Sequence, residues 1–387
     1  MAQKRFKVVK LYGKKETTFG TDPSSDGSGY LFLKLVDGTF VPGMDVIERP
    51  GQVNDLTSQV HVMGCKSGKL GLKFELKGSG TAASAAATAA ELHEILLTLM
   101  GTATVGTGTT VVFAGSTTTV VNVASGAGLS VGMLVNVDCD TNGIQPRFIT
   151  AINTNAITLD HALPSVPAQA TTFAASTMFT RANSGHVSMA FCAERDGVQY
   201  TFLGCKVDSA KISGVTPRGT AILDIGYSVT DWNVTAKGSL PAPTLAGITL
   251  AKAPVVKGSP FCVGGTEEVV YGFDFDFGAK FSFVEALNAL GATQPDAANA
   301  GLELVESQPK GTVKAYFLAS HLTDFIAATT RSLAFAARGT GVAWGIYIPV
   351  AQWGDVGIED TQGMIGHNLP FMVRDNGTSP EFYLSVA

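Results

Sequence analysis

Apolar residues alternate with polar ones along much of the chain, and the clearest alternation lies in residues 198–229. A period of two points successive side chains to opposite faces, which is typical of a half-buried β-strand. Ser213, Gly214, Pro217 and Gly219 interrupt the alternation and are residue types that favour turns. The stretch therefore predicts two antiparallel strands with a long connection, with apolar positions at Val198, Tyr200, Phe202, Ala221, Leu223, Ile225, Tyr227 and Val229.

The same pattern recurs later in the chain. Residues 342–373 align with residues 198–229 without a gap, at an offset of 144 residues. A shorter alternating strand precedes each copy, and in it Leu72 corresponds to Val313. Because strand, helix, strand, turn and strand occur twice in one order, we expect an internal duplication; the alternative is a chance echo between strands of an all-β chain. The predicted helices have the i, i+3, i+4 spacing at Leu92, Ile95 and Leu96 and at Leu322, Phe325 and Ile326.

The two copies differ in length after the helix. The helices are offset by 230 residues and the strands after them by 144, so the first copy carries 86 extra residues. This insertion, residues 102–186, contains short strand-like runs rich in Thr and Val at close spacing, which indicates a small β-barrel or sandwich. Its own apolar content predicts a separately folded module. The expected fold class is therefore mainly β with few helices.

Two stretches, 37–56 and 279–309, lack a regular period and contain several glycines and prolines. We expect long irregular loops there, and such loops in compact domains are usually functional or contact partners. Residues 269–278 alternate strictly, so that Asp274 and Asp276 point away from three phenylalanines. An aspartate pair is compatible with metal binding or acid–base chemistry, but a solvated face opposite a phenylalanine core is the favoured interpretation.

The chain is poor in charge for its size. Of its 387 residues 45% are hydrophobic and 15% are charged, against the roughly 25% usual for soluble domains. The apolar runs are far shorter than the ~20 residues of a membrane-spanning helix. The N-terminal residues lack the apolar core of a secretory signal. We therefore expect no membrane contact, and we expect permanent assembly to cover the apolar surface.

Little in the sequence points to catalysis, a cofactor or a metal. The nucleophile-elbow, phosphate-loop and zinc-helix motifs are absent, and the five cysteines lack CxxC spacing. With a net charge of −5 and no basic stripe, the chain is not expected to bind nucleic acid specifically. Asp355, Glu359 and Asp360 lack calcium-loop spacing, so an exposed polar turn is favoured over a cation site. We expect a protein without enzymatic activity, cofactor or metal.

Several segments resemble the major tail tube proteins of bacteriophages with long, non-contractile tails. They are KETTFGTDP, GTAASAAATAAELHEILLTLMG, DGVQYTFLGCKVDSAKISG with TAILDIGYSVTDW, PKGTVKAYF, and IPVAQWGDVGIEDTQGMI. The resemblance covers nearly all of the chain except the insertion. It implies a β-sandwich flanked by a helix, which packs beside its copies so that the inner sheets close into a barrel. The lumen of that barrel passes DNA.

With two such folds per chain, the resemblance implies a first tube domain of residues 1–101 and 187–240 and a second of residues 241–387. The inserted module, 102–186, would face outward. Three copies would form a pseudo-hexameric ring, with a homohexamer as the alternative. The expected location is the virion tail, assembled in the host cytoplasm, with other tail proteins at the tube ends. The competing interpretation is a secreted or surface β-sandwich binding module, adhesin or lectin-like, which the missing signal peptide disfavours.

The resemblance also implies roles for individual residues. Asp274 and Asp276 are candidates for the lumen wall, which we expect to be mainly acidic, neutral polar or small, because every phosphate held by Lys or Arg adds drag on DNA. The long loops would contact the rings above and below. The candidates for these contacts are Val41, Pro42, Gly43, Met44, Asp45, Pro295 and Asp296.

Overall fold

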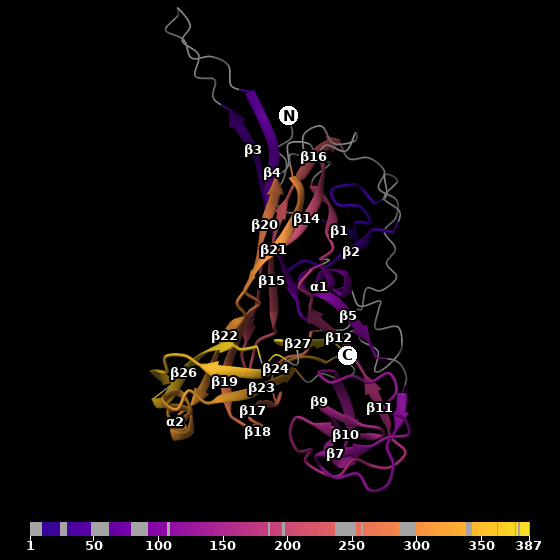
Figure 1. Ribbon diagram of the computed structural model, residues 1–387, viewed down its shortest axis with the longest axis vertical. Helices are drawn as coiled ribbons and strands as arrows, with labels where there is room; N and C mark the ends of the chain where they lie inside the picture. The colour runs from indigo at the N-terminus through magenta and orange to yellow at the C-terminus, as the bar shows by residue number, and fades with distance from the viewer. Residues whose placement is uncertain are drawn as a thin grey trace, which may run out of the picture.

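The chain folds mainly into antiparallel β-sheets, with two short α-helices in the described residues (Figure 1). Within them, 19 strands form one connected sheet, six form a second sheet and two form a separate hairpin. The mainly β class expected from the sequence is confirmed. The computed structural model describes residues 10–23, 29–47, 62–78, 92–106, 109–184, 186–195, 198–236, 253–256, 258–285, 299–337, 343–361, 363–375, 377 and 380–386.

The elements of the large sheet fall into two stretches of chain. The first stretch contains β1 (Lys10–Lys15), β2 (Leu31–Leu33), β3 (Asp37–Ile47), β4 (Val62–Glu75), α1 (His93–Met100), β5 (Gly101–Val105), β12 (Thr177–Arg181), β13 (Met189–Arg195), β14 (Val198–Val215), β15 (Ile222–Val229) and β16 (Asp231–Ala236). The second contains β17 (Phe261–Val263), β18 (Thr266–Glu267), β19 (Val270–Asp276), β22 (Lys310–Tyr316), α2 (Ala319–Ile326), β23 (Thr330–Ala337), β24 (Trp344–Trp353), β25 (Gly357–Thr361), β26 (Met364–Val373) and β27 (Tyr383–Val386).

The long strand β14 holds the first stretch together. Its first half pairs with β13 and β16, and its second half pairs with β15 and β19. The change falls at Gly204, whose φ of 61° is readily adopted by glycine. A Cβ at this position would lie 1.9 Å from Thr230 Oγ1. The sheet folds back on itself there. As a result the ring centroids of Phe191 in β13 and Tyr227 in β15 lie 5.0 Å apart.

Strand pairing in the second stretch repeats that of the first. Seven pairs of strands, β1–β2, β1–β13, β13–β14, β14–β16, β14–β15, β4–β15 and β3–β4, have counterparts in the same chain order. The counterparts are β17–β18, β17–β23, β23–β24, β24–β27, β24–β26, β22–β26 and β19–β22. Eight strands of each stretch thus occupy equivalent positions, with β25 counted as the continuation of β24.

The register of these pairs also repeats. Leu72 of β4 pairs with Ile225 of β15. Val313, at the sequence position matched to Leu72, pairs with Leu369, which lies 144 residues after Ile225. The offset of 241 residues between Leu72 and Val313 and the offset of 144 between Ile225 and Leu369 were read from separate alignments, and both hold in this one cross-strand pair. The same offset of 144 relates the pair Phe191 and Phe202 to the pair Phe335 and Ile346.

The two stretches join side by side in one sheet. Lys211 of β14 lies opposite Asp276 of β19, and Ile212 lies opposite Phe275. The strand order across this part of the sheet is β3, β4, β15, β14, β19, β22, β26 and β25. One hydrophobic core follows the sheet through both stretches; its largest buried side chains include Phe74, Phe202, Tyr227, Phe275, Trp344 and Phe371.

The two stretches predicted to be irregular loops contain paired strands instead. Residues 37–47 form β3, which pairs with β4, so Val41, Pro42, Gly43, Met44 and Asp45 lie in a strand. The β3–β4 hairpin projects beyond the body of the molecule at one end (Figure 1). In the second stretch, β20 (Ala279–Glu285) pairs with β21 (Asn299–Ser307). In β3 the glycines and Pro42 interrupt the alternation of apolar and polar residues, which an edge strand tolerates. Pro295 and Asp296 lie outside the described residues.

The inserted region forms its own six-stranded sheet. Its strand order is β6–β11–β8–β9–β10–β7. An isolated antiparallel β-bridge joins Val112, next to the edge strand β6, to Val123, next to the edge strand β7, so the sheet curves into a half-barrel. The predicted boundaries, 102 and 186, are too wide for this sheet, because β5 and β12 belong to the large sheet. The strands are β6 (Thr109–Val111), β7 (Val120–Asn122), β8 (Leu134–Asp138), β9 (Ile144–Asn153), β10 (Ala156–Leu159) and β11 (Thr172–Ala175).

The six-stranded sheet packs against β23 and β24 of the large sheet. Phe148 of β9 is fully buried and stacks on Tyr347, with 5.6 Å between ring centroids. Leu134 and Phe148 share a small apolar cluster with Ala334 and Ala336. In Figure 1 this sheet lies at the end of the molecule opposite the β3–β4 hairpin. The insertion is therefore a distinct sheet with an apolar attachment to the second stretch.

Candidate functional site

The strongest candidate for a functional surface is the polar face of the sheet from β3 to β25. Strand alternation places apolar side chains of these strands in the core and leaves lysine and carboxylate side chains on the opposite face. Charges of opposite sign lie next to each other there. The lysine–carboxylate distances are 3.5 Å for Lys73–Asp224, 3.9 Å for Lys69–Asp208 and 3.5 Å for Lys314–Glu359.

Asp274 and Asp276 lie on this polar face, as their alternation predicts. Phe273 and Phe275 of the same strand are buried in the core. Asp276 stands opposite Lys211 on one side and Lys310 on the other. The Asp276 Oδ1 also accepts a hydrogen bond from the Gly278 N–H at 2.9 Å.

The charge pattern around these aspartates is mixed. A cavity on this face is lined by both aspartates together with Lys211, Lys310 and Thr312. Alternation along β19 predicted the two aspartates on this face. It could not predict the lysines that the neighbouring strands β14 and β22 place beside them. Cross-strand register supplies those lysines, so the local surface is close to charge balance rather than acidic.

Two strand edges of the same sheet are open in the single chain. Within the described residues, β3 pairs only with β4, and β25 pairs only with β26. Both edges carry exposed apolar side chains, which is unusual for an edge that must stay unpaired in solution. On β3 the exposed side chains include Val41 and Met44. On β25 the exposed side chain is Ile358, and at the start of β26 they are Met364 and Ile365.

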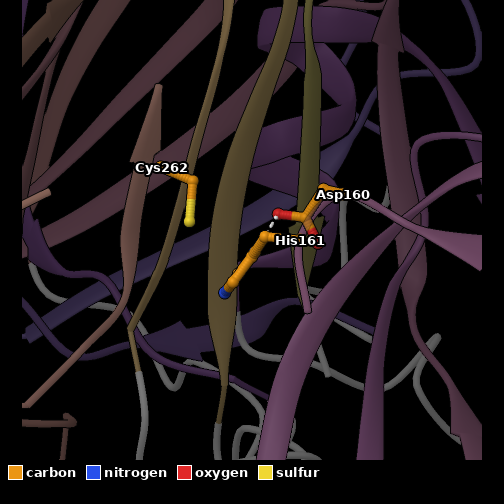
Figure 2. A group of neighbouring side chains, drawn as sticks. All are labelled: Asp160, His161 and Cys262. Carbon is orange, nitrogen blue, oxygen red and sulfur yellow. Dashed lines mark hydrogen bonds and ion pairs between the residues drawn. The ribbon is translucent and has the colours of Figure 1, made fainter. Parts of the chain in front are cut away.

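A second candidate is a buried cluster of Asp160, His161 and Cys262 (Figure 2). Their ligand atoms lie within 4.8 Å of one another, at the contact between the inserted sheet and β17. The His161 Nδ1 lies 2.9 Å from the Asp160 Oδ2, and its Nε2 has no hydrogen-bond partner. Sequence reasoning missed this cluster because Cys262 lies 101 residues after His161 in the chain.

Burial and the neighbouring Arg147 guanidinium make this cluster a poor site for metal binding or nucleophilic catalysis. Burial and the nearby Asp160 raise the pKa of the Cys262 thiol, which stays protonated at neutral pH. The buried Arg147 guanidinium also lies close to the cluster; burial lowers its pKa, and Asp160 and Cys262 act to raise it. A fixed positive charge opposes a bound cation, and a buried neutral thiol is a poor nucleophile. The arrangement therefore serves best as a polar contact within the interface.

Asp355, Glu359 and Asp360 do not converge on one point. Glu359 accepts a hydrogen bond from the Tyr271 hydroxyl at 2.5 Å and lies near Lys314. Asp360 instead accepts a hydrogen bond from the Gly363 N–H at 2.8 Å. Among the described residues, the only group of three His, Cys, Asp or Glu side chains able to share an ion is the Asp160 cluster.

Comparison with known proteins gives no family. No protein-family model and no curated protein sequence matches this chain. Neither α-helix in the described part of the chain is long and apolar enough to cross a membrane.

Proposed function

We propose that the chain is the structural subunit of a bacteriophage tail tube, in which stacked rings surround a lumen that conducts DNA to the host during ejection. The observation that carries this proposal is the repeated strand pairing, with repeated register, of two halves joined in one sheet. Two equivalent halves joined in one sheet can supply two equal sectors of a tube wall. The resemblance of several segments to major tail tube proteins supports the same function.

Under this proposal each half of the chain is a tube domain, a β-sandwich flanked by a helix. Residues 1–101 and 187–240 form the first, and residues 241–387 form the second. The inserted module, proposed as 102–186 and centred on the six-stranded sheet, faces outward. Three chains then supply six sectors to a pseudo-hexameric ring, and a homohexamer is the alternative. Closure of the ring covers open strand edges that otherwise promote aggregation.

The polar face would line the lumen in this arrangement. Affinity for DNA grows with the number of phosphates that Lys and Arg neutralise, through counterion release. Lysines on this face lie beside carboxylates, as in the pair Lys73 and Asp224, which limits their attraction for phosphate. DNA would then pass without specific binding. The protein would act without enzymatic activity or cofactor, as a virion component assembled in the host cytoplasm that contacts other tail proteins at the tube ends.

The test is direct observation of the assembled protein. Purified chain at rising concentration is examined by negative-stain microscopy, and the smallest assembly is weighed by native mass spectrometry. We expect rings and tubes, and a ring mass three times the 40.2 kDa of the chain. Rings of six chains would select the hexamer. Single particles at every concentration would overturn the proposal and favour an isolated binding module.

A further inference from the structure

The junction between the two halves shows how this sheet joins one sector to the next. At that junction β14 of the first half pairs with β19 of the second. Lys211 faces Asp276 on the polar face, and Ile212 faces Phe275 in the core. Both apolar residues have no exposed side-chain surface. The contact therefore combines a backbone ladder with complete burial of apolar side chains.

One half of this junction has a counterpart at the far edge of the sheet. In the first half Lys211 and Ile212 pair with Asp224 and Leu223 of β15. In the second half Gly357 and Ile358 of β25 pair with Asn368 and His367, which lie 144 residues after those β15 positions. Gly357 is therefore equivalent to Lys211, and Ile358 is equivalent to Ile212.

The other half has a counterpart at the opposite edge. Asp276 and Phe275 of β19 pair with Lys310 and Gly311 of β22. The positions 241 residues earlier in β4 are Lys69 and Leu70, and they pair with Val41 and Phe40 of β3. Val41 is therefore equivalent to Asp276, and Phe40 is equivalent to Phe275.

Burial at the equivalent positions differs sharply. Ile212 is 0% exposed, whereas Ile358 is 74% exposed although it lies on the same face as the buried His367 opposite it. At the other edge Phe40, the equivalent of the fully buried Phe275, is only partly buried, and Val41 beside it is 64% exposed. The helix beside the β25 edge is also uncovered. Its region exposes Phe317, Leu318, Leu322 and Ile326, whereas in α1 the residues Ile95, Leu96, Leu99 and Met100 are buried.

We propose that β25 of one copy of this chain pairs antiparallel with β3 of a second copy, with Gly357 opposite Val41 and Ile358 opposite Phe40. The contact repeats between chains the junction that β14 and β19 make within the chain. It buries Ile358 against the neighbour as Ile212 is buried at the internal junction. The proposal rests on the proposed function, since it specifies how the ring closes.

The edge of β3 limits how far this ladder extends. Pro42 follows Val41 directly and has no N–H to donate, so proline in a sheet is confined to edges and ladder ends. The pairing is therefore confined to the part of β3 before Pro42. The part of β3 beyond Pro42 belongs to the projecting hairpin and stays available for other contacts.

Cysteine cross-linking tests the register. The pair Val41→Cys and Gly357→Cys is introduced into a Cys65→Ser background; the other four cysteines are buried. Directly opposed residues lie within disulfide reach, so we expect covalent trimers on non-reducing gels after mild oxidation. The control pairs Gly43→Cys with Gly357→Cys. Gly43 is two residues out of register and lies beyond Pro42, where the pairing ends. It is therefore at least about 7–8 Å from Gly357, beyond disulfide reach, and we expect no cross-link.

A second measurement tests the buried contact. Ile358→Lys is compared with Val166→Lys, a control on the inserted region that is 55% exposed. We expect Ile358→Lys to raise the concentration needed for assembly at least about tenfold, given the size of one apolar burial. The control should assemble as the parent protein does. Circular dichroism of both variants checks that the chain remains folded.

The outcomes separate this inference from the proposed function. Cross-linking only in the opposed pair, with weakened assembly of Ile358→Lys, supports it. Rings that form normally while neither cysteine pair reacts, or while only the shifted pair reacts, overturn the β25–β3 contact and leave the tube function standing. Unchanged assembly of Ile358→Lys also overturns it. Absence of any ring from the parent protein overturns the proposed function itself.

Discussion

The buried Glu16 makes polar contacts that no pattern in the sequence predicts. Glu16 is 4% exposed and accepts three hydrogen bonds. The donors are the Gly20 N–H at 2.9 Å, the Ser188 hydroxyl at 2.5 Å and the Gly204 N–H at 2.7 Å. The carboxylate therefore fixes the N-terminal segment to the point where β14 changes partners. In the sequence Glu16 reads as an ordinary surface residue after two lysines.

We predict that Glu16→Gln lowers the free energy of unfolding by about 1–3 kcal/mol. The amide NH2 of glutamine would replace one carboxylate oxygen, so the N–H or O–H donors facing it would lose their acceptor.

Burial raises the pKa of Glu16 above its ordinary value of 4.5, and its hydrogen bonds only partly offset this. The folded state then holds the proton more tightly than the unfolded state. The stability from this titration is full below the unfolded pKa and is lost as pH rises through the folded pKa.

The loss caused by Glu16→Gln should therefore be largest at acid pH and should shrink as the pH rises from about 4.5 toward neutrality. Denaturant unfolding at a series of pH values measures it. Glu267→Gln, at an exposed position of β18, is the matched control and should change stability by less than about 0.5 kcal/mol. A pH-independent difference between wild type and Glu16→Gln would contradict the assigned pKa direction.

Arg181 shows the same limit of residue-level prediction. It donates to the Ser307 hydroxyl and to the Phe277 carbonyl oxygen at 2.6 Å, and lies 3.8 Å from Glu381. Burial lowers its pKa to about 10. These partners come from 96 to 200 residues away in the chain. A local sequence pattern predicts which face of a strand a side chain lies on. It does not predict which distant segment supplies the hydrogen-bond partners of that side chain.

At the scale of elements, alternation and helical spacing predicted much of the fold. The strands around Leu72, Val198, Leu223 and Val313 are confirmed, as are both helices. Alternation succeeded there because one face is buried and the other solvated. It failed in β3, where glycines and Pro42 interrupt the pattern and Val41 and Met44 are exposed. The strands β20 and β21 were also not predicted, although β20 alternates and buries Ala279 and Phe281.

The β3–β4 hairpin provides the second prediction. Met44 lies opposite Lys66, so replacing residues 45–65 by Asn-Gly closes the hairpin with a two-residue turn and keeps its register. We expect rings that assemble but no longer stack into tubes, because we propose that the projecting part contacts the neighbouring ring. Val41 and Phe40 remain, so lateral contacts are kept. Electron microscopy and sedimentation distinguish rings from tubes.

The matching hairpin of the second half serves as a companion variant. Glu285 lies opposite Asn299, so replacing residues 286–298 by Asn-Gly removes Pro295 and Asp296 and retains β20 and β21. We expect weaker stacking here as well. Normal tubes from both shortened proteins would rule out these hairpins as the contacts between rings. A loss of rings, rather than of stacking, would place them within the ring.

The third prediction concerns the inserted sheet. Val105 and Thr177 face each other, and the Gly106 N–H donates to the Ser176 carbonyl at 3.1 Å. Replacing residues 107–175 by Asn-Gly therefore turns β5 and β12 into a hairpin. We expect ring assembly to persist, with stability reduced by at least the 1.5–3 kcal/mol of burying Phe148. Microscopy and thermal unfolding measure both effects.

Phe148→Ala is the control, since it weakens the attachment of the inserted sheet without deleting it. Large-to-small core changes of this kind cost about 3–5 kcal/mol. If the deletion folds but forms no ring while Phe148→Ala still assembles, the inserted sheet takes part in the ring and does not face outward.

At the scale of the whole molecule, the charge of the proposed lumen decides how DNA moves. We predict that Asp274→Lys with Asp276→Lys converts a balanced region beside Lys211 and Lys310 into a basic one. Assembled tubes should then retain DNA, since each phosphate neutralised adds about 0.9 to the slope of binding against salt. Phage carrying the double variant should eject DNA more slowly. The effect should fade at high ionic strength, where screening acts over a few ångströms.

The matched control is Asp138→Lys with Asp140→Lys on the inserted sheet, which changes the net charge equally at a site proposed to face outward. DNA retention by tubes at several salt concentrations is measured for both variants, together with the ejection rate. Equal retention in the control would show that total charge, not the lumen face, holds DNA. Unchanged retention and ejection in the Asp274 and Asp276 variant would remove these two residues from the lumen wall. A salt-dependent delay confined to that variant would place the polar face of β19 against the passing DNA.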